Sequence, residues 1–361
     1  MANRTRRLIA FYLPQFHPIA ENDEWWGSGF TEWRNVTRGR PRFRGHYQPH
    51  EPADLGFYDL RLDEIRRRQV ELARSYGVDA FCYYHYWFEG KRLLERPFEE
   101  VLSSGEPDFP FLLCWANESW SRVWDGSDRD VLLQQTYSRA DDEAHIRALL
   151  PALRDPRYLR IDGRPVILIW RSDQLPDAAA TTATWRQVAE AEGLGLYLCR
   201  VEASGAVKGD ARQWGFDAAV GFEPDQDHLG PKLRSSLGRR IWRRVVRSKS
   251  GYRLNNVYGY DTMVQRALSD IDPGYLRFPC VTPSWDNSAR RRLGARILTG
   301  ATPESYERWL SQTLQRFSPP TASENLVFVN AWNEWAEGCH LEPDQQFGHA
   351  YGEATARARD Y

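Results

Sequence analysis

The chain has 361 residues, of which 42% are hydrophobic and 27% are charged, and its formal net charge is −1 at pH 7. This balance excludes a largely disordered chain, and the lack of a basic excess argues against nucleic-acid binding. No apolar run approaches the roughly 18 residues that a membrane-spanning helix requires, so we expect a soluble, cytoplasmic protein.

Cysteine and tryptophan usage adds two expectations. The five cysteines occur singly, mostly within apolar runs and without metal-ligand spacing, which is typical of core residues in a reducing compartment. The chain contains 15 tryptophans but only two methionines. Since a buried indole N–H needs a partner, we expect several tryptophans to line a cleft, where flat aromatic faces suit sugar rings. The others are expected in the core.

Eight short apolar or aromatic runs predict β-strands along the chain. In order, they are residues 8–16, 78–88, 109–115, 165–170, 194–201, 216–222, 278–283 and 325–332. Helical periodicity is clear in residues 62–76, 141–153 and 303–317, and a further helix is expected within 261–271. Thr302 followed by Pro303 marks a helix start, because Pro is favoured at the first helical position.

The repeated strand–helix units predict an α/β fold, a (β/α)8 TIM barrel forming a single domain over residues 1–361. Strands that are apolar throughout suit a parallel sheet buried on both faces. The alternative is an open, doubly wound sheet, which usually has a glycine-rich first turn. Here the first strand ends with Pro14-Gln15-Phe16, and no nucleotide-binding glycine motif occurs, which favours the barrel.

A basic insertion is predicted at about residues 229–256. From Lys232 to Arg253 the chain carries nine basic residues and no acid. A helix here would place Ile241, Trp242, Val245 and Val246 on one face, which suits contact with an anionic membrane or a lipid phosphate at the inner membrane face. The alternative is a solvated insertion without a partner.

Polar and aromatic residues gather where the predicted strands end, the rim at which barrel enzymes place their active sites. Their carboxylates, amides and rings could bind sugar hydroxyls and ring faces. The candidate substrate-binding residues are Tyr12, His17, Tyr84, His85, Trp87, Trp115, Asn117, Glu118, Trp120, Glu223, Trp285, Asp286, Asn333, Trp335, His340 and Glu342.

The candidate catalytic residues are Glu334 and Glu337, which stand three positions apart among tryptophans after the last predicted strand. Apolar surroundings and a neighbouring like charge should push their pKa values apart and leave one protonated near neutrality. Cleavage of a glycosidic bond needs such a division between an acid and a base or nucleophile. The structural alternative is a charged loop held by local hydrogen bonds.

Several strings resemble one family. Residues 12–18 (YLPQFHP), 25–33 (WWGSGFTEW), 114–120 (CWANESW) and 124–126 (WDG) are similar to WbsX-type proteins. That family resembles glycoside hydrolase family 99 and is often encoded beside O-antigen or capsule biosynthesis enzymes. Residues 333–343 (NEWAEGCHLEP) match the strand-eight motif of the hydrolase family, N-E-W-x-E-G-x-x-x-E-P.

The resemblance implies a (β/α)8 barrel of the retaining endo-α-mannosidase type, acting on a polysaccharide without metal, nucleotide or other cofactor. It implies that Glu334 deprotonates the sugar's 2-hydroxyl, which attacks the anomeric carbon to give a 1,2-anhydro sugar. Glu337 would then be the acid that releases the leaving group and the base that activates water.

Three functions remain open from the sequence. The first is a retaining glycoside hydrolase or transglycosylase acting on a bacterial surface polysaccharide or its precursor. The second is a glycosyltransferase of O-antigen or capsule biosynthesis, for which Asp128-Arg129-Asp130 resembles a metal- and nucleotide-sugar-binding D-x-D. The third is a barrel that binds glycan without cleaving it, and the two glutamates argue against it.

Overall fold

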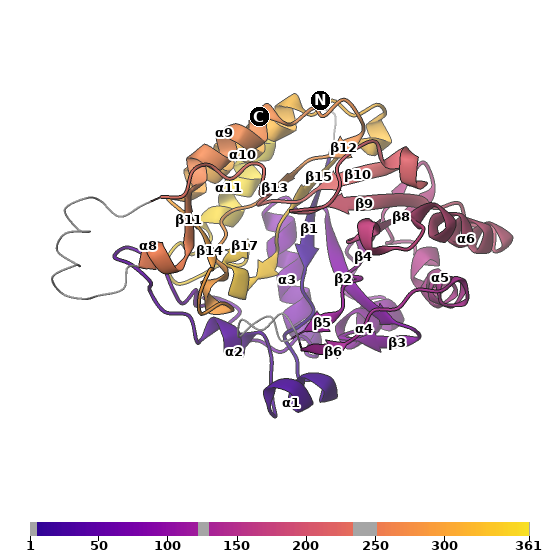
Figure 1. Ribbon diagram of the computed structural model, residues 1–361, viewed down its shortest axis with the longest axis horizontal. Coiled ribbons are helices and arrows are strands. Elements are labelled where there is room, and N and C mark those ends of the chain that lie inside the picture. Colours follow the sequence, from indigo (N-terminus) through magenta and orange to yellow (C-terminus); the bar gives the residue numbers. More distant parts are fainter. Residues whose placement is uncertain (1–5, 122–129, 234–250, 361) are drawn as a thin grey trace.

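A closed parallel β-barrel forms the centre of the molecule (Figure 1). The computed structural model describes residues 6–121, 130–233 and 251–360. The barrel strands are β1 (Arg7–Tyr12), β2 (Ala80–Phe88), β4 (Phe111–Trp115), β8 (Arg164–Ile169), β9 (Tyr197–Glu202), β10 (Ala218–Gly221), β12 (Arg277–Phe278) with β13 (Cys280–Val281), and β15 (Leu326–Val329). Each strand overlaps one of the eight predicted runs, and the predicted (β/α)8 architecture is confirmed.

The seventh strand closes the barrel in two pieces. β12 pairs in parallel with β10, and β13 pairs in parallel with β15. Only Pro279 separates the two pieces, and it has no N–H for a ladder hydrogen bond. Its carbonyl still accepts a 2.8 Å hydrogen bond from the amide of Phe328. One interrupted strand therefore joins both edges of the sheet.

Helices follow most strands and cover the outside of the barrel. They are α3 (Asp63–Ser75), α4 (Arg96–Ser104), α5 (Arg139–Arg154), α6 (Ala178–Ala191), α9 (Tyr260–Ser269), α10 (Pro303–Arg316) and α11 (Ala350–Arg359). The predicted cap of α10 is confirmed, because Thr302 and Ser305 form a capping box. After β9 the chain makes only the short 3-10 turn η3 (Ala211–Trp214).

Short elements occupy the connections. They are α1 (Ala20–Trp26), α2 (Trp33–Val36), β3 (Lys91–Leu93), β5 (Trp120–Ser121), β6 (Val131–Leu133), β7 (Arg160–Ile161), α8 (Gly251–Leu254), β11 (Asn256–Gly259), β14 (Arg296–Thr299), β16 (Asn333–Glu334) and β17 (Cys339–His340). β11 pairs with β14 outside the barrel, over a second small apolar cluster of Phe43, Val257, Ala295 and Ile297. None of the helices described is long and apolar enough to cross a membrane.

Two predicted features lie outside the described residues. The first is the apolar face Ile241, Trp242, Val245 and Val246 of the basic insertion. The second comprises Asp128 and Arg129 of the D-x-D tripeptide together with residues 124–126 of the family-like strings.

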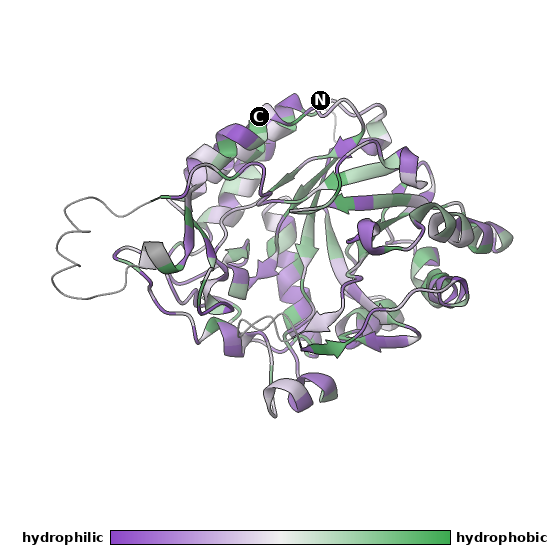
Figure 2. Cartoon of the chain, in the orientation of Figure 1, coloured by the Kyte–Doolittle hydropathy of each residue, from purple (hydrophilic) through white to green (hydrophobic). Residues whose placement is uncertain are grey.

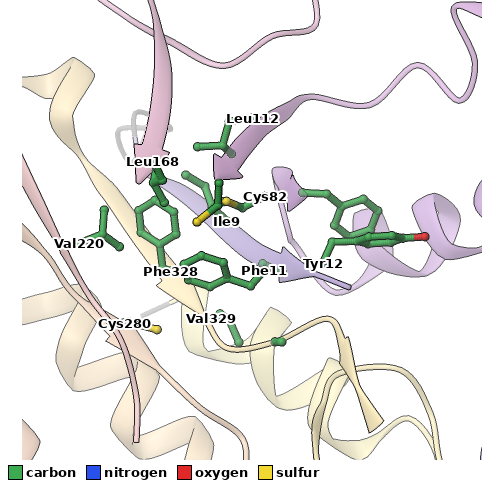
Figure 3. Close-up of a cluster of buried hydrophobic side chains, with 14 of the residues drawn as sticks. Ile9, Phe11, Tyr12, Cys82, Leu112, Leu168, Val220, Cys280, Phe328 and Val329 are labelled. Carbon is green, nitrogen blue, oxygen red and sulfur yellow. The ribbon is translucent and has the colours of Figure 1, made fainter. Parts of the chain in front are cut away.

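The inside of the barrel is a packed core. Figure 3 shows Ile9, Phe11, Cys82, Leu112 and Phe328 converging from several strands, and all five are 0% exposed. The hydropathy of the chain also separates the interior from the outside: the strands at the centre are apolar, whereas the outer helices carry many polar residues (Figure 2). All five cysteines are free and buried, as expected. A filled barrel leaves the loops after the strands as the place for a binding site.

Candidate active site

Both candidate catalytic glutamates lie on a tight hairpin after β15. Glu334 ends β16, which pairs antiparallel with β17, and Glu337 lies in the intervening 3-10 turn. Gly338 follows with φ 61°, a left-handed conformation that favours glycine. A Cβ there would approach the backbone nitrogen of Asp286 to 3.1 Å. The hairpin therefore turns directly against the loop that follows β13.

The guanidinium of Arg290 binds three carboxylates, two from the glutamate hairpin and one from the loop after β1. Its Nη2 lies 3.1 Å from Glu334 Oε2, and its Nη1 lies 2.7 Å from Glu337 Oε1. Its Nε donates a 2.7 Å hydrogen bond to Glu32 Oε1, in the loop after β1. The fork of one arginine suits this arrangement, since its donors point in fixed directions. Glu334 and Glu337 consequently meet on adjacent nitrogens of one cation.

Three carboxylates around one guanidinium favour retention of a proton. Glu334 is only 6% exposed, and burial raises its pKa to about 8. Arg290 opposes this shift, while the negative charges of Glu337 and Glu32 add to it. Burial likewise raises the pKa of Glu32, against the pull of Arg290. A carboxyl that is protonated near neutrality agrees with the expectation from the sequence.

Asp286 ties the loop after β13 to the glutamate hairpin. Its backbone N–H donates a 2.6 Å hydrogen bond to the carbonyl of Glu337. Its Oδ2 lies 2.6 Å from His46 Nε2 and accepts from Gln48 Nε2 at 2.7 Å. Burial alone would raise the pKa of Asp286, but these bonds and the charge of His46 outweigh it and lower that pKa. This predicted binding residue is buried and orients Glu337.

Half-buried aromatic side chains stand at the strand ends near Glu334. Tyr84 stacks on Phe11 with the ring centres 5.7 Å apart, and its pKa is raised by burial and by the charge of Glu334. Trp170 packs edge-on against Tyr84 at 6.0 Å and against Phe222 at 4.4 Å. Rings of this kind can pack against the C–H faces of a sugar.

Glu118 and Trp120 extend this aromatic rim. Glu118 accepts a 3.0 Å hydrogen bond from the indole of Trp170 and pairs with Arg171 at 2.9 Å, yet 46% of its side chain is exposed. The ring of Trp120 packs edge-on against Tyr86 at 5.2 Å. Tyr84, Glu118 and Trp120 are the predicted binding residues that keep an open face at the rim.

Five predicted residues instead form a buried network beneath the hairpin: Tyr12, Asn333, Trp335, His340 and Glu342. Glu342 accepts hydrogen bonds from Trp335 Nε1 at 2.7 Å, Tyr58 Oη at 2.8 Å and Gln69 Nε2 at 2.6 Å. Burial raises its pKa to about 7, although these bonds oppose the shift. Tyr12 Oη donates to Gln69 at 2.7 Å. These side chains hold the hairpin from below.

A second buried group lies between β2, β4 and α5. His85 Nε2 lies 2.9 Å from His145 Nε2, and the indole of Trp87 donates to Asp141 at 2.9 Å. The indole of Trp115 points to the carbonyl of Trp87 at 3.4 Å. His85, Trp87 and Trp115 are each at most 9% exposed, so this group supports the rim without facing it.

The other predicted residues are also buried. Asn117 accepts from the amide of Arg171 at 2.7 Å, and His17 Nδ1 donates to the carbonyl of Pro14 at 3.0 Å. Glu223 Oε1 lies 2.5 Å from His228 Nδ1. Asn333 exchanges hydrogen bonds with both backbone groups of Leu13. Trp285 is 8% exposed.

The sequence did not single out Arg290, Glu32, Trp170 or Phe222 as site residues. Arg290 opens a run of three arginines, and nothing local distinguishes the one that turns inward. Glu32 lies within the family-like string at residues 25–33, which was the available signal. Trp170 and Phe222 end the predicted strands at residues 165–170 and 216–222, but neither is among the candidate binding residues.

Comparisons with known proteins give a family and a fold. Residues 8–355 match the family model described as "Glycosyltransferase WbsX". Two curated relatives, both described as "Uncharacterized protein WxcX", come from Xanthomonas campestris pv. campestris strains B100 and ATCC 33913. Each is 45% identical over 363 residues, covering 97% of this chain and 49% of the relative. The chain thus spans about half the length of these relatives.

Two solved structures share the architecture. One, described as a glycoside hydrolase-like protein, is 14% identical with a TM-score of 0.62, over 99% of this chain and 95% of that one. The other is the glycoside hydrolase family 99 endo-α-mannosidase from Bacteroides thetaiotaomicron, 13% identical with a TM-score of 0.59, over 98% of this chain and 96% of that one. At such low identity, these likenesses establish the fold alone.

Proposed function

Because the chain belongs to the WbsX family, we propose that it is a carbohydrate-active enzyme, a retaining glycoside hydrolase or transglycosylase. The substrate proposed is a bacterial surface polysaccharide or its precursor. One observation carries the proposal: Glu334 and Glu337 meet on the guanidinium of Arg290 at the carboxyl-terminal rim of a barrel. Half-buried aromatic rings beside them supply a surface for a sugar ring.

The proposed reaction has two steps. Glu334 takes the proton from the 2-hydroxyl of the sugar, and that oxygen attacks the anomeric carbon while Glu337 protonates the departing oxygen. The product is a 1,2-anhydro sugar. Glu337 then removes a proton from water, or from an acceptor hydroxyl, which attacks the anomeric carbon and reopens the ring. Glu334 returns its proton to the 2-oxygen, and two inversions give net retention.

The electrostatics of Glu334 suit a base of this kind. An alcohol is a weak acid, so a carboxylate whose pKa is raised to about 8 accepts its proton more readily than an ordinary one. Before each turnover Glu334 must first be deprotonated. The proposed mechanism therefore requires an acid limb in the pH–rate profile.

Profiles of kcat/KM against pH test this assignment of roles. A panel of 4-nitrophenyl glycosides, screened first to find one that turns over, is the probe. The proposed mechanism needs Glu334 deprotonated and Glu337 protonated in the free enzyme, so kcat/KM should rise with pH, reach a maximum and fall again. In the residual activity of Glu337→Gln the falling limb should be lost, and in that of Glu334→Gln the rising limb; the opposite pattern would reverse the roles of the two glutamates. Retained product stereochemistry by NMR is expected in addition.

A glycosyltransferase of O-antigen or capsule biosynthesis is the second candidate, and the description of the family itself favours it. Calorimetry against UDP-, GDP- and dTDP-sugars, with and without Mn²⁺, separates the two functions. Nucleotide-sugar binding together with transfer to an acceptor would support the transferase. Release of free reducing sugar from a glycoside without any nucleotide would support the hydrolase.

A further inference from the structure

A compact cluster of two histidines and one aspartate lies behind the glutamate hairpin. His50, in the segment after α2, places Nδ1 2.9 Å from Nε2 of His340 in β17. His340 Nε2 in turn lies 3.7 Å from Asp344 Oδ2. The three ligand atoms all lie within 4.8 Å of one another, and the residues are 7%, 4% and 3% exposed.

The tautomer of His340 directs a lone pair into this cluster. Its Nδ1 lies 2.9 Å from the carbonyl of Glu342, a group that can only accept, so Nδ1 carries the hydrogen. In the neutral ring, Nε2 is then unprotonated and faces His50 and Asp344. A hydrogen bond from the far nitrogen to a carbonyl is the usual way in which proteins orient a metal-ligating histidine.

Neighbouring rings fix both imidazoles. His340 stacks on Trp335 with ring centres 3.7 Å apart and planes 15° apart. His50 stacks on Tyr47 at 4.2 Å and 24°. Because neither ring is free to turn, the fold itself holds Nδ1 of His50 toward Nε2 of His340.

Asp344 contributes a buried carboxylate oxygen that lacks a cationic partner. Its Oδ1 accepts from the amides of Gln346 at 2.9 Å and Phe347 at 2.6 Å, which leaves Oδ2 directed toward the imidazoles. No lysine or arginine among the described residues forms an ion pair with it. A buried carboxylate of this kind calls for a cation.

We propose that His50, His340 and Asp344 bind a divalent transition metal ion, with Zn²⁺ the best fit. Zinc binds imidazole nitrogen at 2.0–2.1 Å and carboxylate oxygen at about 2.0–2.2 Å, so tetrahedral donors lie roughly 3.3 Å apart. The separations of 2.9 Å between the two imidazole nitrogens and 3.7 Å between His340 and Asp344 lie on either side of that spacing. Three protein ligands leave a fourth position for water.

The ion would join two segments around the candidate active site without entering the reaction. His340 is the cross-strand partner of Asn333, next to Glu334. The segment of His50 is already attached beyond the hairpin, through a bridge between Pro52 and Asp344. A metal at this position would fasten the hairpin to that segment. This metal site does not depend on the proposed function.

Metal binding to the full chain, purified without chelators and freed of any affinity tag, tests the proposal. We expect about one zinc per chain by inductively coupled plasma mass spectrometry. After removal of zinc with EDTA, one equivalent of Co²⁺ should give the intense visible bands of a tetrahedral complex, and added Zn²⁺ should abolish them and raise the melting temperature.

Two variants and one control complete the test. Asp344→Asn and His50→Asn should each weaken Co²⁺ affinity about 100-fold or more, since each removes a direct ligand and second-shell losses alone reach 10–100-fold. His349→Asn, at a half-exposed histidine paired with Asp54, should bind like wild type. A wild-type chain without a Co²⁺ spectrum would overturn the proposal and leave a plain His50–His340 hydrogen bond. Unchanged affinity in folded Asp344→Asn would overturn it too.

Discussion

Glu334 and Glu342 lie eight positions apart on the same loop, and burial raises the pKa of both, to about 8 and about 7. Their partners differ. Glu334 shares the cation Arg290 with two other carboxylates, whereas Glu342 accepts three hydrogen bonds from neutral donors. Burial and a raised pKa alone therefore do not identify a catalytic carboxyl.

The partners decide what each carboxyl can do. Neutral donors aimed at both oxygens of Glu342 fix its position and leave no room for a substrate, which suits a structural role. Around Glu334, ionised neighbours at the rim make the proton easy to exchange when a ligand changes the local charge. The same local chemistry thus yields a candidate base in one place and an anchor in the other.

The largest expected effect separates these roles by activity. Glu334→Gln should lower kcat by about 10³-fold or more, since general acid–base groups contribute 10²–10⁴-fold, without lowering the melting temperature. Glu342→Gln should show the opposite pattern, with a lower melting temperature and a kcat within roughly tenfold of wild type. Steady-state kinetics and calorimetry measure both. A Glu334→Gln enzyme with near-normal kcat would remove the distinction.

Removing the shared cation should destabilise the protein. Arg290→Met leaves Glu32, Glu334 and Glu337 without their common partner, and we expect the free energy of unfolding to fall by about 3–5 kcal/mol. The loss should be larger at pH 8 than at pH 5, where the raised pKa of Glu334 leaves its carboxyl protonated. Arg291→Met, at the exposed neighbouring arginine, is the matched control and should be nearly neutral. Urea unfolding measures both variants, and equal losses of unfolding free energy would contradict a special role for Arg290.

The carboxyl of Glu342, which anchors the hairpin, can be removed without introducing a charge. Glu342→Leu leaves the donors of Tyr58, Gln69 and Trp335 unpaired in a buried setting, and each unpaired group costs about 1–3 kcal/mol. We expect a loss of about 3 kcal/mol in unfolding free energy. Phe57→Ala, at a 54% exposed side chain beside Tyr58, should cost less than about 1 kcal/mol. Equal losses in both would contradict an anchoring role.

The barrel and the glutamate pair were predictable from the sequence for physical reasons. Parallel strands buried on both faces must be apolar throughout, so eight runs gave eight strands, including the one interrupted at Pro279. Glu334 and Glu337 stood out because paired acids among tryptophans are costly without a purpose.

The partners of these glutamates could not be predicted, because they come from other loops. Arg290 and Glu32 approach Glu334 only after the chain has closed the barrel. Position at the rim also does not tell which way a side chain turns, and Trp335 and Glu342 turn toward each other beneath the hairpin. A turn such as η3 in place of a longer helix after β9 carries no clear signal either.

The pH dependence of the unfolding free energy is the smallest expected effect, and it should differ between Glu342 and Glu334. The folded state holds a proton on Glu342 up to about pH 7, whereas an unfolded chain releases it near 4.5. Because the folded state binds more protons between these values, the contribution of Glu342 to stability is greatest below about pH 4.5 and is lost as pH rises toward 7. At 1.36 kcal/mol per pKa unit, the total loss is at most about 3 kcal/mol.

Substitution by glutamine should remove each carboxyl's part of this pH dependence. The difference in unfolding free energy between wild type and Glu342→Gln should change with pH up to about 7 and then stay constant. For Glu334→Gln the change should continue to about pH 8, since its raised pKa lies higher. Urea unfolding at one-unit steps from pH 5 to pH 9 measures both. Differences that do not vary with pH would mean that both groups ionise as in water, and that neutral and charged partners hold a buried carboxyl equally well.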